Sequence, residues 1–274
     1  MSKVALVTGA NQGLGFALAA GLAQRMTRDD VVYLTGRDGE RVAAAAARIE
    51  GARAQVRTRV LDVRDEAAVG ALAGELGAVD VVFSNAAARL TPDTAWPELI
   101  GPFVDTNNLG TTHMLRAFSP ILRPGGRLLI VASAFGSLRE LPEQLRSRFD
   151  TDAMTLDDVD AAMRDWRNAV LEGRAGDEGW PDWINIPSKI GQVAAVRVLA
   201  RERRTADEAD GTLVAAVCPG LVDTDASRPW FDDMSKAQSP LDAAEALLQL
   251  ALEPDVDPRF YGELVQYAKV IPWR

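Results

Sequence analysis

The sequence predicts an α/β fold of the Rossmann type, a doubly wound parallel sheet of seven strands. Three observations predict it. Short apolar runs alternate with longer Ala- and Leu-rich segments along the chain, which is the pattern of repeated βαβ units. The first apolar run leads into a Gly-rich turn and a helix, and several later runs end in small or polar residues, where open parallel sheets bind ligands. No repeat or low-complexity linker divides the chain, so we expect one domain, 1–274.

The composition excludes several classes of protein. The chain has 274 residues, of which 47% are hydrophobic and 25% charged, as in soluble globular proteins. A net charge of −9 argues against a nucleic-acid partner, and no apolar stretch is long enough to span a membrane. The single cysteine, Cys218, reads as a small buried side chain and fits a reducing, cytoplasmic compartment. The start, Met1-Ser2-Lys3, runs directly into an apolar strand and does not resemble a signal peptide.

The first βαβ unit carries the signature of a dinucleotide site. The apolar run Val4–Val7 is predicted as a strand, and an Ala- and Leu-rich helix extends to about Met26. Between them lies the turn Thr8-Gly9-Ala10-Asn11-Gln12-Gly13-Leu14-Gly15. Glycines let the backbone approach a pyrophosphate at a helix N-terminus, where the helix dipole favours anions. This turn has the strand and the helix that the motif requires, so we expect it to bind a dinucleotide.

The second strand indicates which dinucleotide binds. Strand Val31–Thr35 precedes an Ala-rich helix over about 38–50. An acidic residue at the end of this strand would bind a ribose 2′-hydroxyl and select NAD. Here the strand ends in Thr35-Gly36-Arg37, and Arg37 can pair with a 2′-phosphate, although Asp38 follows it. We therefore expect the cofactor to be NADP(H).

Polar residues mark the ends of the next strands. Strands Gln55–Leu61 and Val79–Phe83 are separated by a helix that begins near Asp65. The second of these strands ends in Ser84-Asn85-Ala86-Ala87, and a helix containing Asn107 follows. Strand Leu128–Val131 ends in Ala132-Ser133-Ala134.

An insertion at about 139–182 interrupts the alternation of strands and helices. It contains two charged helical patches, 142–149 and 156–171, and the second has an apolar stripe that includes Met163 and Trp166. We interpret the stripe as packing for an inserted subdomain; the alternative is a substrate lid. A helix resumes at about 187–204.

The remaining segments complete the seven strands. Strand Leu213–Val217 ends in Cys218-Pro219-Gly220-Leu221-Val222-Asp223-Thr224, a loop contains Trp230, and a helix over 240–252 precedes a last strand near 263–266.

With these residues in order, the chain resembles the short-chain dehydrogenase/reductase family along nearly its whole length. The resemblance rests on matches at Gly9, Gly13 and Gly15, Asp62-Val63, Asn85-Ala86-Ala87, Asn107, Ser133, Lys189, and Pro219-Gly220-x-Val222-x-Thr224. The family pairs a tyrosine with a lysine four residues later, and here Asn185 stands four residues before Lys189. On a helix these two positions share one face.

Within the family, the chain is most similar to the monomeric carbonyl reductases. The similarity lies in Thr35-Gly36-Arg37-Asp38, in Gly179-Trp180-Pro181 and in the long insertion, which places Asn185 52 positions after Ser133. In those reductases the insertion covers the helix face that other members use to dimerise. The resemblance therefore implies a monomer that acts on a small molecule, and no metal site is expected.

The resemblance also implies roles for individual residues. Ser133 would polarise a substrate carbonyl, Lys189 would hold the nicotinamide ribose hydroxyls, and Asn107 would position a water. The cofactor would be held at its phosphates by Gly9, Asn11, Gln12, Gly13, Leu14 and Gly15, at the 2′-phosphate by Arg37, at adenine by Asp62 and Val63, at ribose by Asn85 and Ala86, and at nicotinamide by Pro219, Gly220, Val222 and Thr224.

The departure at Asn185 leaves three hypotheses. A tyrosine phenol beside a lysine can donate a proton, whereas an amide can only donate a hydrogen bond. The first hypothesis is an NADP(H)-dependent reductase that works without the tyrosine, with water on Ser133 or Lys189, or an acidic group of the substrate, supplying the proton. The second is a noncatalytic NADP-binding sensor or scaffold, and the third is dehydratase or isomerase chemistry in the same pocket.

Aromatic residues give the only sequence signal for the substrate. Those on segments that border the family's pocket are Phe135, Trp183, Trp230 and Phe231, joined by Met234. Aromatic walls suit a bulky, possibly polycyclic substrate. Quinones, activated enones and enolisable ketones need the least acid assistance, so they fit the first hypothesis best.

Overall fold

The structure, a computed structural model that describes residues 2–274, contains one sheet of eight strands. The strands are β1 (Val4–Val7), β2 (Val31–Gly36), β3 (Gln55–Val60), β4 (Val79–Ser84), β5 (Leu122–Val131), β6 (Leu213–Val217), β7 (Leu264–Gln266) and β8 (Lys269–Ile271). Their order is β3-β2-β1-β4-β5-β6-β7-β8, and only β8 is antiparallel to its neighbour. All seven predicted parallel strands are present; the eighth, antiparallel strand was not predicted.

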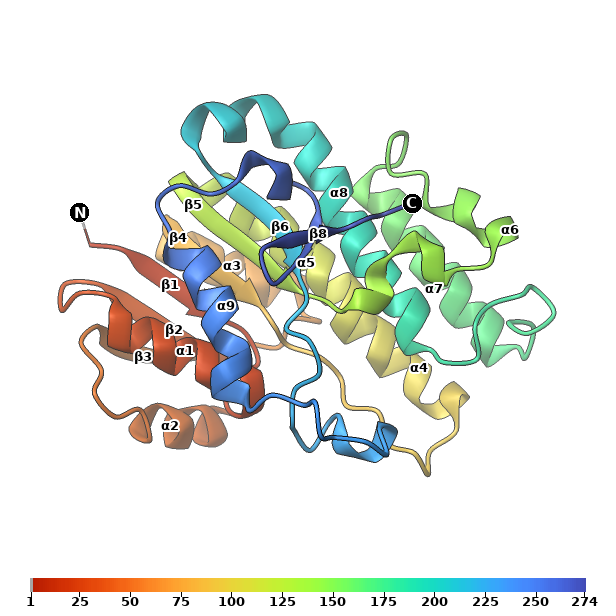
Figure 1. Cartoon of the computed structure of the whole chain (residues 1–274), viewed down its shortest axis with the longest axis horizontal. Helices are drawn as coiled ribbons and strands as arrows, with labels where there is room; N and C mark the ends of the chain where they lie inside the picture. Colours follow the sequence, from red (N-terminus) through yellow and green to blue (C-terminus); the bar gives the residue numbers. More distant parts are fainter. Residues whose placement is uncertain (1) are drawn as a thin grey trace.

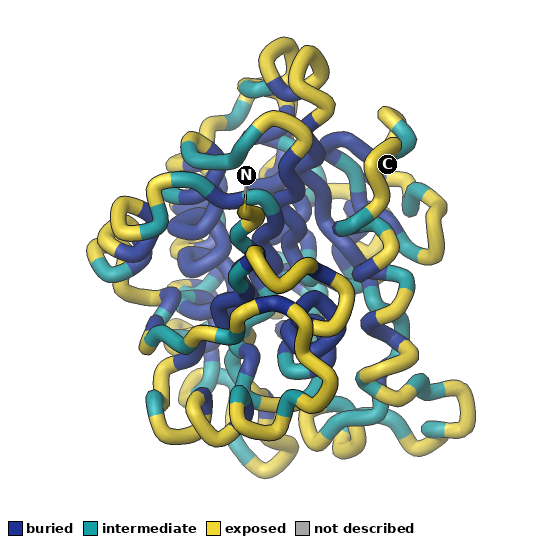
Figure 2. Tube along the Cα trace, turned by 90° about the vertical axis from the view of Figure 1, so that its left-hand side faces the viewer, coloured by how far each residue is buried: buried dark blue, intermediate teal, exposed yellow. Residues whose placement is uncertain are grey.

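Helices cover both faces of this sheet. They are α1 (Gly13–Arg25), α2 (Gly39–Ala47), α3 (Glu66–Leu76), α4 (Trp96–Val104), α5 (Gly110–Phe118), α6 (Glu143–Arg146), α7 (Leu156–Leu171), α8 (Asn185–Asp210) and α9 (Pro240–Leu252). Helix α1 packs against α9 on one face, while α5 packs between α3 and α8 on the other (Figure 1). Figure 2 shows the consequence, a buried centre inside an exposed shell. The doubly wound α/β fold is thus confirmed.

Local sequence signals set several helix boundaries. The side chains of Asp38 and Asp65 accept hydrogen bonds from backbone N–H groups in the first turns of α2 and α3. Thr155 and Asp158 form a reciprocal capping box at the start of α7. Helix α8 ends at Asp210 and is capped by Gly211, which has a φ of 67°, a left-handed conformation that glycine adopts without strain.

The insertion packs tightly against the helical face. Met163 and Trp166 of α7 are almost fully buried, and the Met163 sulfur lies so close to Gly191 of α8 that an added Cβ would be 2.4 Å away. The buried Asp160 accepts hydrogen bonds from Thr112 Oγ1 (2.8 Å) and Arg116 Nη1 (2.9 Å) on α5. Met163 and Trp166 of the apolar stripe are therefore part of the core, as the packing interpretation expects, whereas Leu171 at the end of the stripe is 51% exposed.

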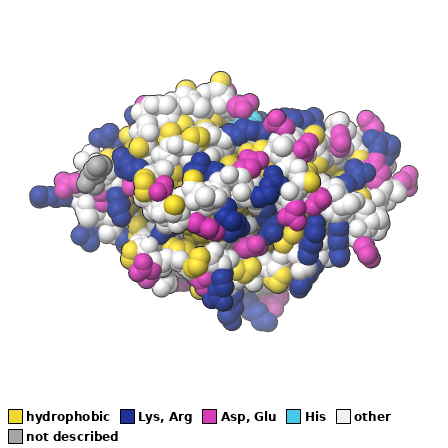
Figure 3. Space-filling view, turned by 90° about the horizontal axis from the view of Figure 1, so that it is seen from above, with side chains coloured by type: hydrophobic (Ala, Val, Ile, Leu, Met, Phe, Trp, Pro, Cys, Tyr) yellow, Lys and Arg dark blue, Asp and Glu magenta, His cyan; other side chains and the backbone are white. Residues whose placement is uncertain are grey.

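The surface carries mixed charge. On the face seen in Figure 3, basic and acidic side chains are interspersed. No helix in residues 2–274 is long and apolar enough to cross a membrane.

Candidate cofactor groove and active site

A groove of about 670 Å³ opens at the carboxyl ends of β1, β2 and β4, where the strand order reverses. This is where doubly wound sheets bind ligands. The predicted residues that line it are Gly9, Asn11, Gln12, Gly13, Leu14, Gly15, Arg37, Asp62, Val63, Asn85, Ala86 and Thr224. The structure therefore brings the Gly-rich turn and the ends of three separate strands to one cradle.

The glycines of this cradle are required by close backbone approaches. A Cβ on Gly15 would lie 2.3 Å from the Gly9 carbonyl oxygen, and a Cβ on Gly9 would lie 2.9 Å from Ala86 Cα. Gly9 also has a φ of 64°. Asn85 ties the two loops together because its Nδ2 donates to the Thr8 carbonyl at 3.0 Å. The groove is thus preformed, with backbone at its floor.

Two arginines give one end of the groove a positive charge. Arg37 lines the groove as predicted, and Arg41 of α2 lines it too and donates to Gln12 Oε1 at 2.7 Å. Asp38 does not line the groove; its carboxylate caps α2 by accepting from the Arg41 backbone N–H at 3.0 Å. Arg41 was not predicted, although its position four residues after Arg37 was an available signal.

At the predicted adenine position, Asp62 is held by an arginine. Arg64 Nη2 donates to Asp62 Oδ2 at 2.6 Å, and Arg64 Nε donates to both carboxylate oxygens at 3.0 Å. These hydrogen bonds, with a smaller contribution from Arg37, hold the pKa of Asp62 below its usual range. The carboxylate is therefore fixed in its charged form at the edge of the groove.

A second hollow of about 440 Å³ contains the candidate catalytic residues. Ser133 follows β5, Asn107 lies before α5, and Asn185 and Lys189 lie one turn apart at the start of α8. The predicted cofactor-binding residues in this hollow are Leu14, Gly220, Val222 and Thr224. Because Leu14 and Thr224 line both hollows, the catalytic hollow continues the cofactor groove.

Lys189 has an unusual environment within this hollow. Its Nζ donates to Gln192 Oε1 at 2.7 Å. Burial lowers the pKa of the Lys189 ammonium from 10.5 to about 8, and the nearby Cys218 opposes this effect. Burial in turn raises the pKa of the Cys218 thiol. At neutral pH Lys189 is thus a cation that releases its proton far more readily than an ordinary lysine.

Asn107 lies in a short π-helical turn, Asp105–Leu109, between α4 and α5. Turns of this kind occur often at functional sites. The Asn107 Oδ1 accepts a hydrogen bond from the Ala88 N–H at 2.9 Å. This bond ties the π-helical turn to the loop that follows β4, on the wall of the catalytic hollow.

Four aromatic side chains line the hollow and pack against one another. Trp183 lies at its centre, with ring centroids 5.3 Å from Phe135, 6.0 Å from Phe231 and 6.2 Å from Trp230. All four of these residues line the hollow, whereas Met234 does not. The charged residues among those that line it are two cations, Lys189 and Arg89, and no Asp or Glu of the described chain is among them.

Pro219 and His113 line neither hollow, whereas Cys218 lines the catalytic one. Pro219 is the one predicted cofactor-binding residue that lines neither hollow; its carbonyl accepts from Gln238 Nε2 at 3.4 Å. His113 is buried, and its Nδ1 lies 2.9 Å from the Val63 carbonyl oxygen. Cys218 is buried as expected, but it also lines the catalytic hollow.

No tyrosine of the described chain lines either of the two hollows. Tyr33 lies in β2, the Tyr261 hydroxyl donates to Asp207 Oδ2 at 2.7 Å, and the Tyr267 hydroxyl accepts from Gln238 Nε2 at 2.6 Å. None of them occupies the place of the missing phenol. Among residues 2–274 there is also no group of His, Cys, Asp and Glu placed to hold a metal ion.

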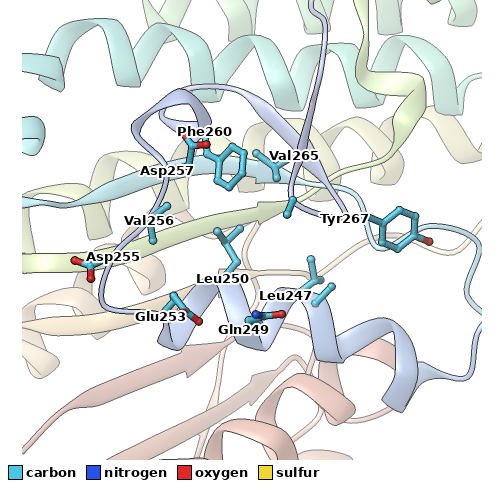
Figure 4. Close-up of a pocket in the computed structure, with 12 residues that line it drawn as sticks. Leu247, Gln249, Leu250, Glu253, Asp255, Val256, Asp257, Phe260, Val265 and Tyr267 are labelled. Atoms are coloured by element: carbon cyan, nitrogen blue, oxygen red, sulfur yellow. The ribbon is translucent and has the colours of Figure 1, made fainter.

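A third hollow, of about 350 Å³, lies between α9 and the turn that joins β7 to β8. Figure 4 shows Leu250, Val256 and Phe260 around it, with Tyr267 at its edge. It contains none of the candidate catalytic or cofactor-binding residues.

Comparison with known proteins identifies the family. Residues 3–144 match the family described as short chain dehydrogenase. Carbonyl reductase (NADPH) 1 of Mus musculus is 32% identical over 98% of both chains. The chain belongs to the short-chain dehydrogenase family.

A second relative agrees in sequence over its full length, and a solved structure agrees in fold. Carbonyl reductase (NADPH) 3 of Rattus norvegicus is 34% identical over 99% of both chains. The structure of salutaridine reductase from Papaver somniferum superposes with a TM-score of 0.80 at 24% identity, covering 96% of this chain and 99% of that one. The resemblance inferred from the motifs and the fold inferred from the strand pattern are both confirmed.

Proposed function

We propose that this short-chain dehydrogenase is an NADPH-dependent reductase of carbonyl groups, or of activated enones and quinones, on bulky small molecules. The observation that carries the proposal is the shared hollow of Ser133, Asn185 and Lys189, which continues directly into the dinucleotide groove. The relatives named carbonyl reductase (NADPH) match over nearly their whole length, which supports both the reaction and the cofactor.

The groove fits NADP(H) on two structural grounds. Its Gly-rich turn packs so closely on the loop after β4 and on itself that a Cβ at Gly9 or Gly15 would clash with neighbouring protein atoms, and such a tight glycine turn is typical of a pyrophosphate site. Arg37 and Arg41 supply positive charge where a 2′-phosphate would distinguish NADP from NAD. We assign the phosphates to the Gly-rich turn, the adenine to Asp62 and Val63, the ribose to Asn85 and Ala86, and the nicotinamide end to Gly220, Val222 and Thr224. When bound, the cofactor supplies the hydride.

The residues of this chain would stabilise the charge on the substrate oxygen and supply the proton. Ser133 would donate a hydrogen bond to the substrate carbonyl oxygen, and the Asn185 amide can donate a second one. As the carbonyl carbon accepts hydride, negative charge develops on the oxygen, and these donors stabilise it. We assign the proton to the Lys189 ammonium, directly or through a water that Asn107 helps to position. Lys189 is left as a neutral amine and regains a proton from solvent.

The shape and charge of the hollow favour a particular substrate class. Trp183 and its aromatic neighbours suit a flat, bulky ring system. Lys189 and Arg89 are both cations, so they favour a substrate whose oxygen becomes negative easily. Quinones, activated enones and enolisable ketones meet both conditions and need little acid assistance.

A noncatalytic NADP-binding protein is the second candidate. It is favoured by Asn185, which cannot supply a proton, and by the bond that turns Lys189 towards Gln192. On this alternative, Lys189 and Asn107 would serve only to shape the cofactor site.

We also propose that the chain acts as a single-domain monomer in the cytoplasm. The insertion supports the monomer because α7 packs against α4 and α8, the face that dimeric family members leave free for a partner. The pairs Arg116–Asp160 (2.9 Å) and Arg167–Asp105 (3.1 Å) bind α7 to this face. The single cysteine is consistent with a reducing compartment.

Steady-state reduction of a panel of quinones and activated ketones, with NADPH and with NADH, tests the function and the cofactor. We expect turnover with a lower KM for NADPH than for NADH. Arg37→Ala should raise the KM for NADPH by about tenfold or more, since a charged hydrogen bond contributes about 1.5–3 kcal/mol, and should leave the KM for NADH unchanged. Arg53→Ala, at an exposed site outside both hollows, is the control. Equal KM values for the two cofactors would contradict the Arg37 assignment.

A further inference from the structure

We propose that Gln192 is a positioning residue of this active site, which anchors the Lys189 ammonium and keeps it protonated. The hydrogen bond between Lys189 and Gln192 follows from the geometry alone, whereas its importance for catalysis rests on the proposed function. Gln192 lies three residues after Lys189 on α8, so both side chains share one face of the helix. No motif of the family pointed to this position in the sequence.

A continuous chain of hydrogen bonds carries the inference. Lys189 Nζ donates to Gln192 Oε1 at 2.7 Å, and Gln192 Nε2 donates to Thr111 Oγ1 at 3.0 Å. Thr111 Oγ1 donates in turn to the Asn107 carbonyl oxygen at 2.7 Å. The chain therefore connects the lysine of α8 to the π-helical turn that holds Asn107.

The direction of this chain is fixed by chemistry. An ammonium has only donors, so Lys189 requires an acceptor, and the amide oxygen of Gln192 is the one it contacts. The Thr111 hydroxyl gives its proton to the Asn107 carbonyl, which leaves its lone pairs to accept from the Gln192 amide nitrogen. Turning the amide over would place a donor against the ammonium. Gln192 thus has a single satisfied orientation.

Burial makes this arrangement rigid. Gln192, Thr111 and Asn107 are only 3%, 2% and 2% exposed. Hydrogen bonds at such depth are stronger than in water, and an unpaired polar group there is costly. Gln192 consequently cannot swing to solvent without leaving the Thr111 side unpaired, so it holds Lys189 in one place.

Apart from Gln192, few groups lie close enough to Lys189 to affect its protonation. Cys218 at the end of β6 is close, and its ionised form would favour the charged lysine, but burial raises the pKa of this thiol and so disfavours that form. Arg89, from the loop after β4, lines the same hollow and is a like charge. The His113 ring of α5 contacts the Val63 carbonyl. The Asp160 carboxylate of α7 accepts hydrogen bonds from Thr112 and Arg116. With no carboxylate lining the hollow in the described chain, Gln192 is the contact that supports the positive charge.

The test is a direct titration of Lys189. The chain contains four lysines, Lys3, Lys189, Lys236 and Lys269, so carbon-13 labelling at the lysine ε-carbon gives few resonances, and Lys189→Met assigns the one of interest. We expect the pKa of Lys189 to be about 8 in the unaltered protein. In Gln192→Met it should fall by about one to two units, because the charged form loses a hydrogen-bond acceptor. In Gln192→Glu it should rise, because a carboxylate favours the ammonium.

Gln249→Met, on the exposed side of α9, is the matched control and should leave the titration unchanged. A Lys189 pKa that is the same in Gln192→Met and Gln192→Glu as in the unaltered protein would overturn the inference. If Gln192→Met fails to fold, the opposite shift expected for Gln192→Glu still decides it.

The same variants separate this inference from the proposed function. If Lys189 supplies the proton, the pH at which kcat falls should follow the measured pKa from variant to variant. If the pKa moves and the kcat profile does not follow it, Gln192 still positions Lys189, and the role of Lys189 as proton source is wrong.

Discussion

Asn185→Tyr is expected to raise kcat for carbonyl reduction by about 100-fold or more. A positioned general acid typically contributes 10²–10⁴-fold, about 3–5 kcal/mol of barrier. Asn185 lies one turn before Lys189 and lines the same hollow, so a phenol there would stand beside the ammonium that lowers its pKa. The measurement is kcat for one activated ketone at saturating NADPH, from pH 6 to pH 10.

Asn185→Phe is the matched control, since it adds the same ring without the hydroxyl. It should show no gain in kcat. An equal increase in both variants would mean that the ring acts by shape and that no acid had been missing. Equal kcat in Asn185→Tyr and the unaltered protein would mean that Lys189 and its surroundings already supply the proton at full rate.

Lys189→Met is expected to lower activity while stabilising the folded protein. Its kcat should fall by about tenfold or more, because the proton would then have to come from water. This loss is smaller than the gain expected for Asn185→Tyr, because the Lys189 ammonium is bonded to Gln192 and is a less well placed acid than a phenol at position 185. The pKa of Lys189 falls from 10.5 to about 8 on burial, so below pH 8 the folded state carries a cost of up to about 3 kcal/mol for the buried charge. Between pH 8 and 10.5 the folded protein loses this proton before the unfolded chain does, so its stability rises with pH. The advantage of Lys189→Met in urea unfolding should be full at pH 7 and absent above pH 10.5.

Lys236→Met provides the control, because Lys236 is exposed on the loop before α9. It should change neither kcat nor the free energy of unfolding. A loss of stability in Lys189→Met at pH 7 would show that the bond to Gln192 outweighs the cost of burial, and that the charge on Lys189 is not strained in the folded state.

The parts of the site that lie in local motifs were predictable from the sequence. The Gly-rich turn is recognisable because the strand, the turn and the helix are contiguous, and the backbone approaches at Gly9 and Gly15 confirm its geometry. Seven strands were found from their apolar runs. Strand β8 was missed because its hairpin turn uses Tyr267 and Ala268 at positive φ, where glycine or asparagine is the usual signal.

The parts that depend on distant contacts were not predictable. Gln192 and Thr111 are 81 positions apart in the chain, and nothing in either local sequence indicates that they meet. Arg89 was missed for the same reason; its Nη2 reaches the Asp225 carbonyl at 2.8 Å from a loop on the other side of the groove. The lowered pKa of Lys189 follows from burial created by the whole fold.

The central claim is that the unaltered protein transfers hydride without the tyrosine. Its most direct test uses NADPH deuterated at one or the other face of C4 with an activated ketone, whose alcohol carbon retains the label. We predict deuterium in the alcohol from one face only, formed at a rate that falls as the pH rises past about 8. Label transferred by Asn185→Tyr and not by the unaltered protein would contradict the claim and leave a cofactor-binding protein whose pocket is silent in redox chemistry.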